Sequence, residues 1–282
     1  MLKRILVPLD SSEYSSAAVK LAVQISKTSS AKGPQATTIV GLGVVDLDQI
    51  PTGRFADIID REKLISEAEA TAEELMNDFT RKASALGVDE KHLETRKVVG
   101  SPFHHIIRES VFTDLIVMGE KCSYPPVHHD YDTMHSLYHS SSRPIILTDT
   151  NSREIERVVI AMDGTAPASR MLYTYMQLNP FPKAKVVLTY SLAEKEEYQL
   201  DGFFERIAKS LSEHGIDVIT RPYQEDLGEE APEILQEEDA QLLALGAHRE
   251  HFLERIINPF NLRESLAHKL LRTSKASLFI VN

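Results

Sequence analysis

The sequence lacks the features that mark secreted, disulfide-bonded and membrane proteins. Its 282 residues include one cysteine, Cys122, and no tryptophan. A single cysteine excludes an intrachain disulfide framework and fits a reducing compartment. No apolar run approaches the roughly 18 residues of a membrane-spanning helix, and the opening apolar run meets Asp10 too early for a signal-peptide core. We therefore expect a cytoplasmic protein with no membrane partner.

Basic charge is also scarce, and the common catalytic signatures are missing. The chain has 31 Lys and Arg residues against 42 Asp and Glu, a formal net charge of -11. Such a surface repels nucleic-acid phosphates and anionic lipids, so we expect no nucleic-acid partner. The sequence has no Gly-x-Ser-x-Gly elbow, P-loop or His-Glu-x-x-His motif. These absences favour a binding protein over an enzyme.

What the sequence does contain is an internal repeat. The run from Lys3 to Asp10 is echoed by the run from Glu156 to Asp163, 153 residues later. Apolar runs and amphipathic stretches then alternate in the same order in both copies. The expected strands cover 3–10, 37–45, 95–99, 114–119 and 144–147 in the first copy and 156–163, 184–190, 218–223, 241–246 and 277–281 in the second. The expected helices cover 17–25, 64–83 and a short stretch from Pro102, then 171–178, 203–211 and a short stretch from Pro232, with Gly87 and Gly215 as helix stops.

This alternation predicts two tandem α/β domains, 1–150 and 151–282, each with a mostly parallel sheet between helices. Ligands of such folds bind at the carboxyl ends of the strands. That rule selects Asp10 and Asp163, which follow the first strand of each copy, and Gly119 and Gly246, which end the fourth.

Three motifs carry a family resemblance: the first strand ending in Asp, the run DLIVMG at 114–119 and the closing PIIL strand. They resemble the universal stress protein family, and the resemblance extends over both copies. It implies two Rossmann-like (adenine nucleotide alpha hydrolase-like) domains, each with a five-stranded sheet. It also implies a stress-response role, and an intrachain pairing of the two domains through antiparallel final strands, as in a family dimer fused into one chain.

The resemblance also implies a phosphate-binding loop, Gly-x2-Gly-x9-Gly-Ser/Thr, after the fourth strand. Glycine lets backbone N–H groups approach the phosphates of ATP at a helix N-terminus. The first copy instead reads Gly119-x2-Cys122-x9-Asp132-Thr133, and the second reads Gly246-x2-Arg249 with a longer loop to about Ser265. Side chains thus occupy positions where bare backbone would meet phosphate, which predicts degenerate nucleotide loops.

Some positions still match the family's adenine and ribose contacts. They are Asp10, Asp163, Val45 and Tyr190. Each aspartate also suits a second role, because Asp in a strand-to-helix turn caps the following helix. An ATP-binding or weakly ATP-hydrolysing switch is therefore an alternative function, and Asp10 and Thr133 are its best support.

A zinc site is a further alternative. Cys122, His128, His135 and His139 lie within one stretch, and the last two have the i, i+4 spacing of helical metal ligands. A histidine-rich loop that titrates in solvent explains the same residues.

The leading hypothesis is a tandem stress protein that senses a small ligand, an adenine nucleotide or another small anion, or binds a protein partner, without catalysis. A monomer that mimics the family dimer and a homodimer of whole chains both fit the surface composition.

Overall fold

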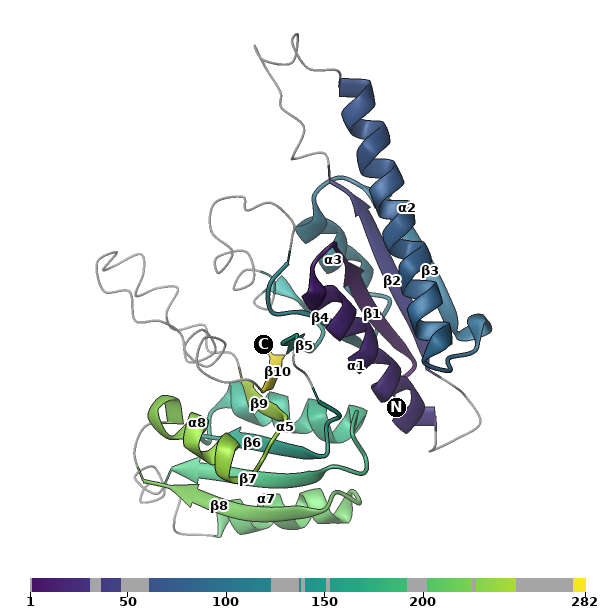
Figure 1. Cartoon of the computed structure of the whole chain (residues 1–282). Coiled ribbons are helices and arrows are strands. Elements are labelled where there is room, and N and C mark those ends of the chain that lie inside the picture. Colours follow the sequence, from purple (N-terminus) through teal and green to yellow (C-terminus); the bar gives the residue numbers. More distant parts are fainter. Residues whose placement is uncertain are drawn as a thin grey trace, which may run out of the picture. The chain divides into compact units, whose positions relative to one another are not determined.

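The structure, a computed structural model, describes residues 2–30, 37–46, 61–122, 137, 140–150, 153–191, 202–224, 227–246 and 276–282. The chain divides into two compact units, an N-terminal unit, Leu2–Arg143, and a C-terminal unit, Pro144–Asn282 (Figure 1). Each unit is an α/β layered structure. Among the described residues, no helix combines the length and apolar character needed to cross a membrane.

The N-terminal unit has a parallel sheet in the order β3-β2-β1-β4. Its elements are β1 (Arg4–Leu9), α1 (Glu13–Ser30), β2 (Thr38–Val45), α2 (Arg61–Ala85), the short 3-10 helix η2 (Glu90–His92), β3 (Leu93–Val99), α3 (Pro102–Ser110) and β4 (Leu115–Gly119). Strands β1, β2 and β4 are almost wholly buried. Helices cover both faces of such a sheet, which is why these strands read as continuous apolar runs.

The C-terminal unit repeats this plan and adds the strand that closes the first copy. Its elements are β5 (Ile145–Thr148), β6 (Arg157–Met162), α5 (Ala166–Leu178), β7 (Lys185–Ser191), α7 (Phe203–Glu213), β8 (Val218–Tyr223), α8 (Leu227–Glu237), β9 (Leu242–Gly246) and β10 (Ser277–Val281). The strand order is β5-β10-β9-β6-β7-β8. Strand β5 pairs antiparallel with β10, with Ile146 opposite Phe279, and the other strands are parallel. The antiparallel pairing of the two final strands is therefore confirmed.

The sequence located the described strands within about two residues and the helices less closely, since α5 and α8 both begin five residues before the positions expected for them. Gly87 and Gly215 follow α2 and α7 with left-handed φ values of 86° and 73°, as expected of helix stops. Helix α8 was expected to begin near Pro232, but it begins at Leu227 and contains Pro232 in its interior. The prediction was wrong because tertiary packing outweighs the proline here: Ala231, Ile234 and Leu235 are all buried in the core.

The two units fix the start of their first strand in the same way. In the N-terminal unit, the backbone N–H groups of Lys3 and Arg4 donate to Oδ2 of Asp114, at 2.7 and 2.9 Å. In the C-terminal unit, the N–H groups of Glu156 and Arg157 donate to Oε1 of Gln241, at 3.0 and 2.9 Å. The carboxylate of Asp114 and the amide of Gln241 therefore have the same role, because each places one oxygen where it accepts hydrogen bonds from two adjacent N–H groups.

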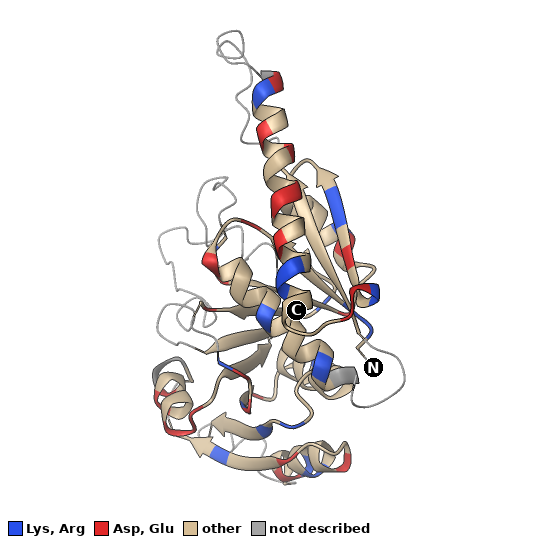
Figure 2. Ribbon diagram, turned by 45° about the vertical axis from the view of Figure 1, so that its right-hand side comes forward, with Lys and Arg blue, Asp and Glu red and all other residues tan. Residues whose placement is uncertain are grey.

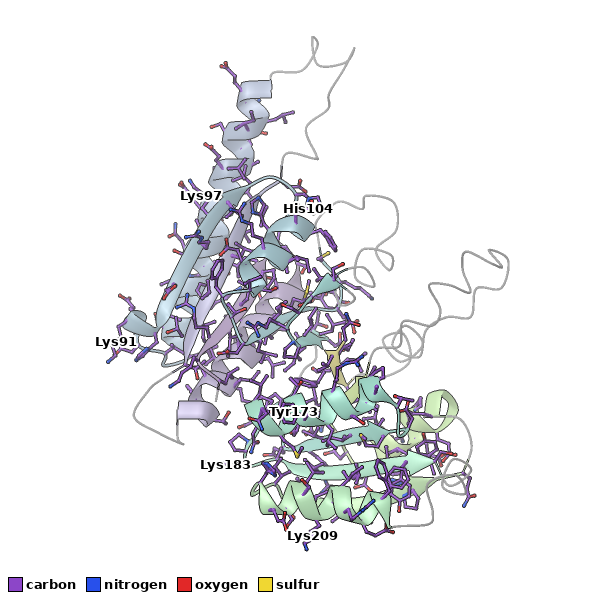
Figure 3. All side chains as sticks on the ribbon, turned by 180° about the vertical axis from the view of Figure 1, so that it is seen from behind. Lys91, Lys97, His104, Tyr173, Lys183 and Lys209 are labelled. Atoms are coloured by element: carbon purple, nitrogen blue, oxygen red, sulfur yellow. The ribbon has the colours of Figure 1, made fainter. Side chains whose placement is uncertain are left out.

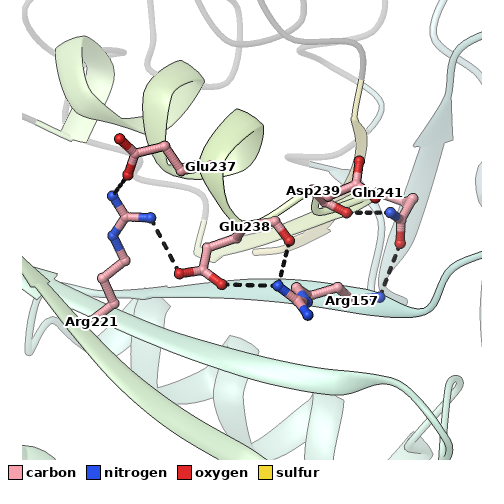
Figure 4. Close-up of polar contacts among 6 residues, drawn as sticks. All are labelled: Arg157, Arg221, Glu237, Glu238, Asp239 and Gln241. Atoms are coloured by element: carbon pink, nitrogen blue, oxygen red, sulfur yellow. Dashed lines mark hydrogen bonds and ion pairs between the residues drawn. The ribbon is translucent and has the colours of Figure 1, made fainter.

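A charged network surrounds this junction in the C-terminal unit (Figure 4). Arg157 donates to the backbone oxygen of Glu238 at 2.8 Å, and Arg221 contacts the carboxylates of both Glu237 and Glu238. Gln241 donates to the backbone oxygen of Asp239. The turn between α8 and β9 is thereby tied to strands β6 and β8.

We expect Asp114→Asn to cost less than about 1 kcal/mol of unfolding free energy, because an amide oxygen can accept the same two N–H bonds. Asp114→Ala should cost about 2 kcal/mol, since two partly buried N–H groups lose their acceptor. Urea denaturation of both variants checks this. Equal losses for Asn and Ala would show that the charge of Asp114, not the position of its oxygen, is what matters.

The core of the C-terminal unit contains a polar atom that no described residue satisfies. Tyr175 on α5 is fully buried, and its ring meets Phe279 of β10 edge-on, with centroids 5.6 Å apart. The Tyr175 hydroxyl has no hydrogen-bond partner among the described residues. Burial raises the pKa of Tyr175 well above its usual range. The ring stabilises the core, whereas the hydroxyl opposes folding.

Tyr175→Phe should therefore leave the unfolding free energy unchanged or raise it by up to about 2 kcal/mol, because it removes only an unpaired buried hydroxyl. The matched variant Phe279→Leu, which removes the facing ring, should destabilise the protein. Thermal and urea unfolding provide the comparison. A loss of stability in Tyr175→Phe would reveal that the hydroxyl has a partner.

Candidate ligand-binding site

The carboxyl end of β1 leads directly into a turn held by Asp10. The N–H of Ser12 donates to Oδ1 of Asp10 at 2.7 Å, and the N–H of Asp10 donates to Oγ of Ser15 at 3.2 Å. Ser12 then caps α1, because its Oγ accepts the N–H of Ser15 at 3.2 Å. Asp10 therefore shapes the turn, and Ser12, not Asp10, is the residue that caps the helix.

The C-terminal unit builds the same turn 153 residues later. Both the N–H and the hydroxyl of Thr165 donate to Oδ1 of Asp163, at 2.9 and 2.6 Å. Thr165 caps α5 by accepting the N–H of Ala168 at 3.3 Å. The paired aspartates of the repeat thus have a common role in holding the turn, whereas the capping role predicted for them from the sequence belongs to Ser12 and Thr165.

The glycines that end β4 and β9 lie against the first turn of these helices. A Cβ atom on Gly119 would lie 2.4 Å from Cβ of Tyr14, and one on Gly246 would lie 2.4 Å from the carbonyl carbon of Pro167. Tyr14 and Pro167 occupy equivalent positions, each four residues after the aspartate. Real Cβ atoms essentially never make contacts below 3.0 Å. Glycine is required at both positions for the helix to approach the strand end.

The first turns of the two helices differ in the donors they present. The capping bonds use equivalent N–H groups in both units, those of Ser12 and Ser15 in α1 and those of Thr165 and Ala168 in α5, but at the position equivalent to Tyr14 helix α5 has Pro167, which has no N–H. In α1, the N–H groups of Glu13 and Tyr14 have no partner among the described residues. The ammonium of Lys121 lies 5.5 Å from the centre of the Tyr14 ring. The N-terminal unit therefore retains more capacity to hold an anion, although the carboxylate of Glu13 stands beside it.

The two residues matched to adenine contacts, Val45 and Tyr190, do not lie at equivalent positions along β2 and β7. Val45 is the buried last residue of β2, and its carbonyl accepts the N–H of Gly100 at 3.0 Å. Tyr190 pairs with Met162, the position equivalent to Leu9, whereas Leu9 pairs with Gly43. Tyr190 is therefore the counterpart of Gly43 rather than of Val45.

The Tyr190 ring is committed to the core. It stacks on Phe204 of α7 with centroids 3.9 Å apart and an interplanar angle of 4°. In the N-terminal unit the large side chains at this layer come from the helix instead, because Gly43 and Gly41 of β2 leave room for Met76 and Phe79 of α2.

Several predicted site residues lie outside the described part of the chain. They are Asp132, Thr133, Arg249 and Ser265 of the phosphate loops and His128, His135 and His139 of the zinc hypothesis. Cys122 is described and is partly exposed. Within the described residues, no three His, Cys, Asp or Glu side chains gather as a metal site. The zinc site therefore stays a prediction.

The model of the universal stress protein family matches the chain twice, over residues 1–123 and 174–282. The chain belongs to the universal stress protein family. Its tandem architecture is also found in a universal stress protein from Archaeoglobus fulgidus DSM 4304, at 17% identity over 99% of this chain and 98% of that one, with a TM-score of 0.73. A protein of unknown function from Pseudomonas aeruginosa PAO1 matches at 13% identity over 99% and 92% of the two chains, with a TM-score of 0.58. A comparison with curated proteins finds no match.

Sequence reasoning missed Asp46 in this family fold. It follows β2 directly and is only 8% exposed, so it places a buried carboxylate at the same edge of the sheet as Asp10. The signal was available, because an Asp that ends a buried strand is what selected Asp10. The contact of Gly119 with Tyr14 had no comparable signal, since it joins residues far apart in the chain.

Gly119→Ala and Gly246→Ala should each lower the unfolding free energy by about 2–3 kcal/mol, because the added methyl group overlaps a helix backbone or Cβ that cannot move aside. Gly215→Ala is the control: no described residue has an atom within 4 Å of its added Cβ, so the φ of 73° is the unfavourable feature there. That variant should lose about 1 kcal/mol. Denaturant unfolding measures all three, and equal losses would contradict the packing role.

Proposed function

We propose that this family member is a noncatalytic stress-response module that senses a small ligand or binds a protein partner, with degenerate nucleotide loops. The observation that best supports this proposal is the hydrogen bonding in the first turn of α5. Its capping bonds use the N–H groups of Thr165 and Ala168, and Pro167 has no N–H, so a phosphate would find fewer donors here than at α1, while the packing of Gly246 against Pro167 accounts for that glycine.

The sequence of the loops supports the same proposal in the N-terminal unit. Cys122 and Asp132 replace two of the glycines that the family's phosphate loop carries. A carboxylate at position 132 repels a polyanion, and a side chain at 122 occupies space that backbone would share with phosphate. In each unit, therefore, a different defect weakens nucleotide binding.

A second candidate function is nucleotide binding by the N-terminal unit alone. It is favoured by the two N–H groups of Glu13 and Tyr14, which no described residue accepts, together with the nearby charge of Lys121. An anion at this helix terminus would gain both backbone donors and a cation. Thr133 keeps the hydroxyl of the family loop.

Titration calorimetry with Mg-ATP separates the two candidates. We expect no binding in the micromolar range for the natural sequence. The double variant Cys122→Gly with Asp132→Gly restores the glycine pattern, and we expect it to bind at least roughly tenfold more tightly, since backbone donors become accessible and a repulsive charge is removed.

The matched control is Cys122→Ala with Asp132→Asn, which removes the thiol and the charge but not the side chains. It should recover less binding than the glycine pair. Micromolar affinity in the natural sequence would overturn the proposal and establish the second candidate. An unchanged affinity in the glycine pair would show that the loop substitutions are not the cause.

A further inference from the structure

Strand β3 is the outermost described strand of the N-terminal unit, and its outer edge is uncovered by any other described strand. Its four central residues, from Glu94 to Lys97, are all exposed. Acidic and basic side chains follow one another along it, as Figure 2 shows, and Figure 3 places Lys97 at the margin of the unit. An open edge of this kind is a template for another strand.

The backbone groups that face outward can be assigned from one bond. The N–H of Gly100 donates to the carbonyl of Val45, so Gly100 faces β2. Successive residues of a strand face opposite neighbours, so Leu93, Thr95, Lys97 and Val99 direct their N–H and C=O groups away from β2. The ring of His105 bonds the carbonyl of Val99 at 2.9 Å, which agrees with this assignment.

A second copy of β3 fits this edge in one antiparallel register. A twofold axis perpendicular to the sheet requires that facing residues lie on the same side of both copies. Centred on Thr95, the register places Thr95 opposite Thr95 and Leu93 opposite Lys97 of the second copy. These are outward-facing residues, so each such pair exchanges two backbone hydrogen bonds. Facing threonines are favourable cross-strand pairs.

The same register matches the charges. Glu94 falls opposite Arg96 of the second copy, twice by symmetry, as a non-hydrogen-bonded pair in which side chains lie closest. Within its own chain Glu94 binds Arg4, and Nε of Arg96 lies 3.5 Å from Glu109. The side chains of Glu94 and Arg96 are still 50% and 61% exposed, which leaves each able to meet a further charge.

Other edges and registers lack this match. Centring the pair on Arg96 would set two arginines against each other. In the C-terminal unit, the outermost described strand β8 contains Pro222, and a pair centred on Thr220 would set Ile219 against Arg221 with no acidic residue. Of these two described edges, only β3 has an acidic and a basic residue equally spaced about an outward-facing threonine.

We propose that β3 is a self-association edge, through which two copies of this chain form an antiparallel twofold dimer centred on Thr95. The partner is a second copy of the chain. The contact is made of backbone hydrogen bonds and two ion pairs, without a large apolar core, so we expect a dimer with micromolar affinity.

Sedimentation equilibrium of the full chain, from micromolar to millimolar concentration, tests the proposal. The natural chain should shift from monomer to dimer mass. Thr95→Pro removes an outward N–H that β2 does not use, so it should keep the circular dichroism of the folded protein while abolishing the dimer. Thr95→Ser is the control and should dimerise as the natural chain does. A natural chain that stays monomeric, or a proline variant that still dimerises, overturns the proposal.

Mixing two charge variants tests the register itself. Arg96→Glu places acidic residues opposite each other, and Glu94→Lys places basic residues opposite each other, so each alone should dimerise at least roughly tenfold more weakly. Their equimolar mixture should recover the dimer as a heterodimer, because one chain is then acidic at both positions and the other is basic at both. Failure of the mixture to recover would overturn the Thr95-centred register, even if the proline variant behaves as expected.

Discussion

The close approach between a strand end and a helix start constrains the candidate site in both units. Gly119 meets Tyr14, and Gly246 meets Pro167, at distances that exclude any side chain. The turn that follows β1 or β6 can therefore adopt only a narrow range of positions. The capping bonds of Ser12 and Thr165, and the aspartates that hold the turns, lie in these same segments. An anion at either site would have to use whatever donors the packed turn leaves over.

The duplication shows which features of the fold are demanded by physics and which are open to drift. The turn aspartate, the capping hydroxyl and the terminal glycine are retained in both copies. The acceptor at the start of the first strand is a carboxylate in one copy and an amide in the other, because only the position of the oxygen matters to the two N–H groups. The sequences that follow β4 and β9, where the family resemblance predicts phosphate-binding loops, differ in contrast between the two copies.

Much of the architecture was predictable from local signals. Continuous apolar runs located the buried strands, and the glycines Gly87 and Gly215 located two helix ends. The candidate positions Asp10, Asp163, Gly119 and Gly246 followed from one topological rule. What could not be read locally depends on distant residues: Pro232 remains inside α8 because its neighbours are buried, and Tyr14 explains Gly119 only once the chain is folded. The pairing of Asp114 with Lys3 and Arg4 spans more than a hundred residues and has no local signature.

The layer between β2 and α2, compared with that between β7 and α7, has a consequence for protein engineering. One copy has its large side chains on the helix, with Phe79 and Met76 against glycines of the strand, and the other has an aromatic ring on both elements, with Tyr190 of β7 stacked on Phe204 of α7. A chimaera that grafts β7 beneath α2 would therefore place the Tyr190 ring where Gly43 now leaves room for Met76, and the two side chains would overlap. Recombination between the two halves can preserve a well-packed core only when each strand is exchanged together with the helix that covers it.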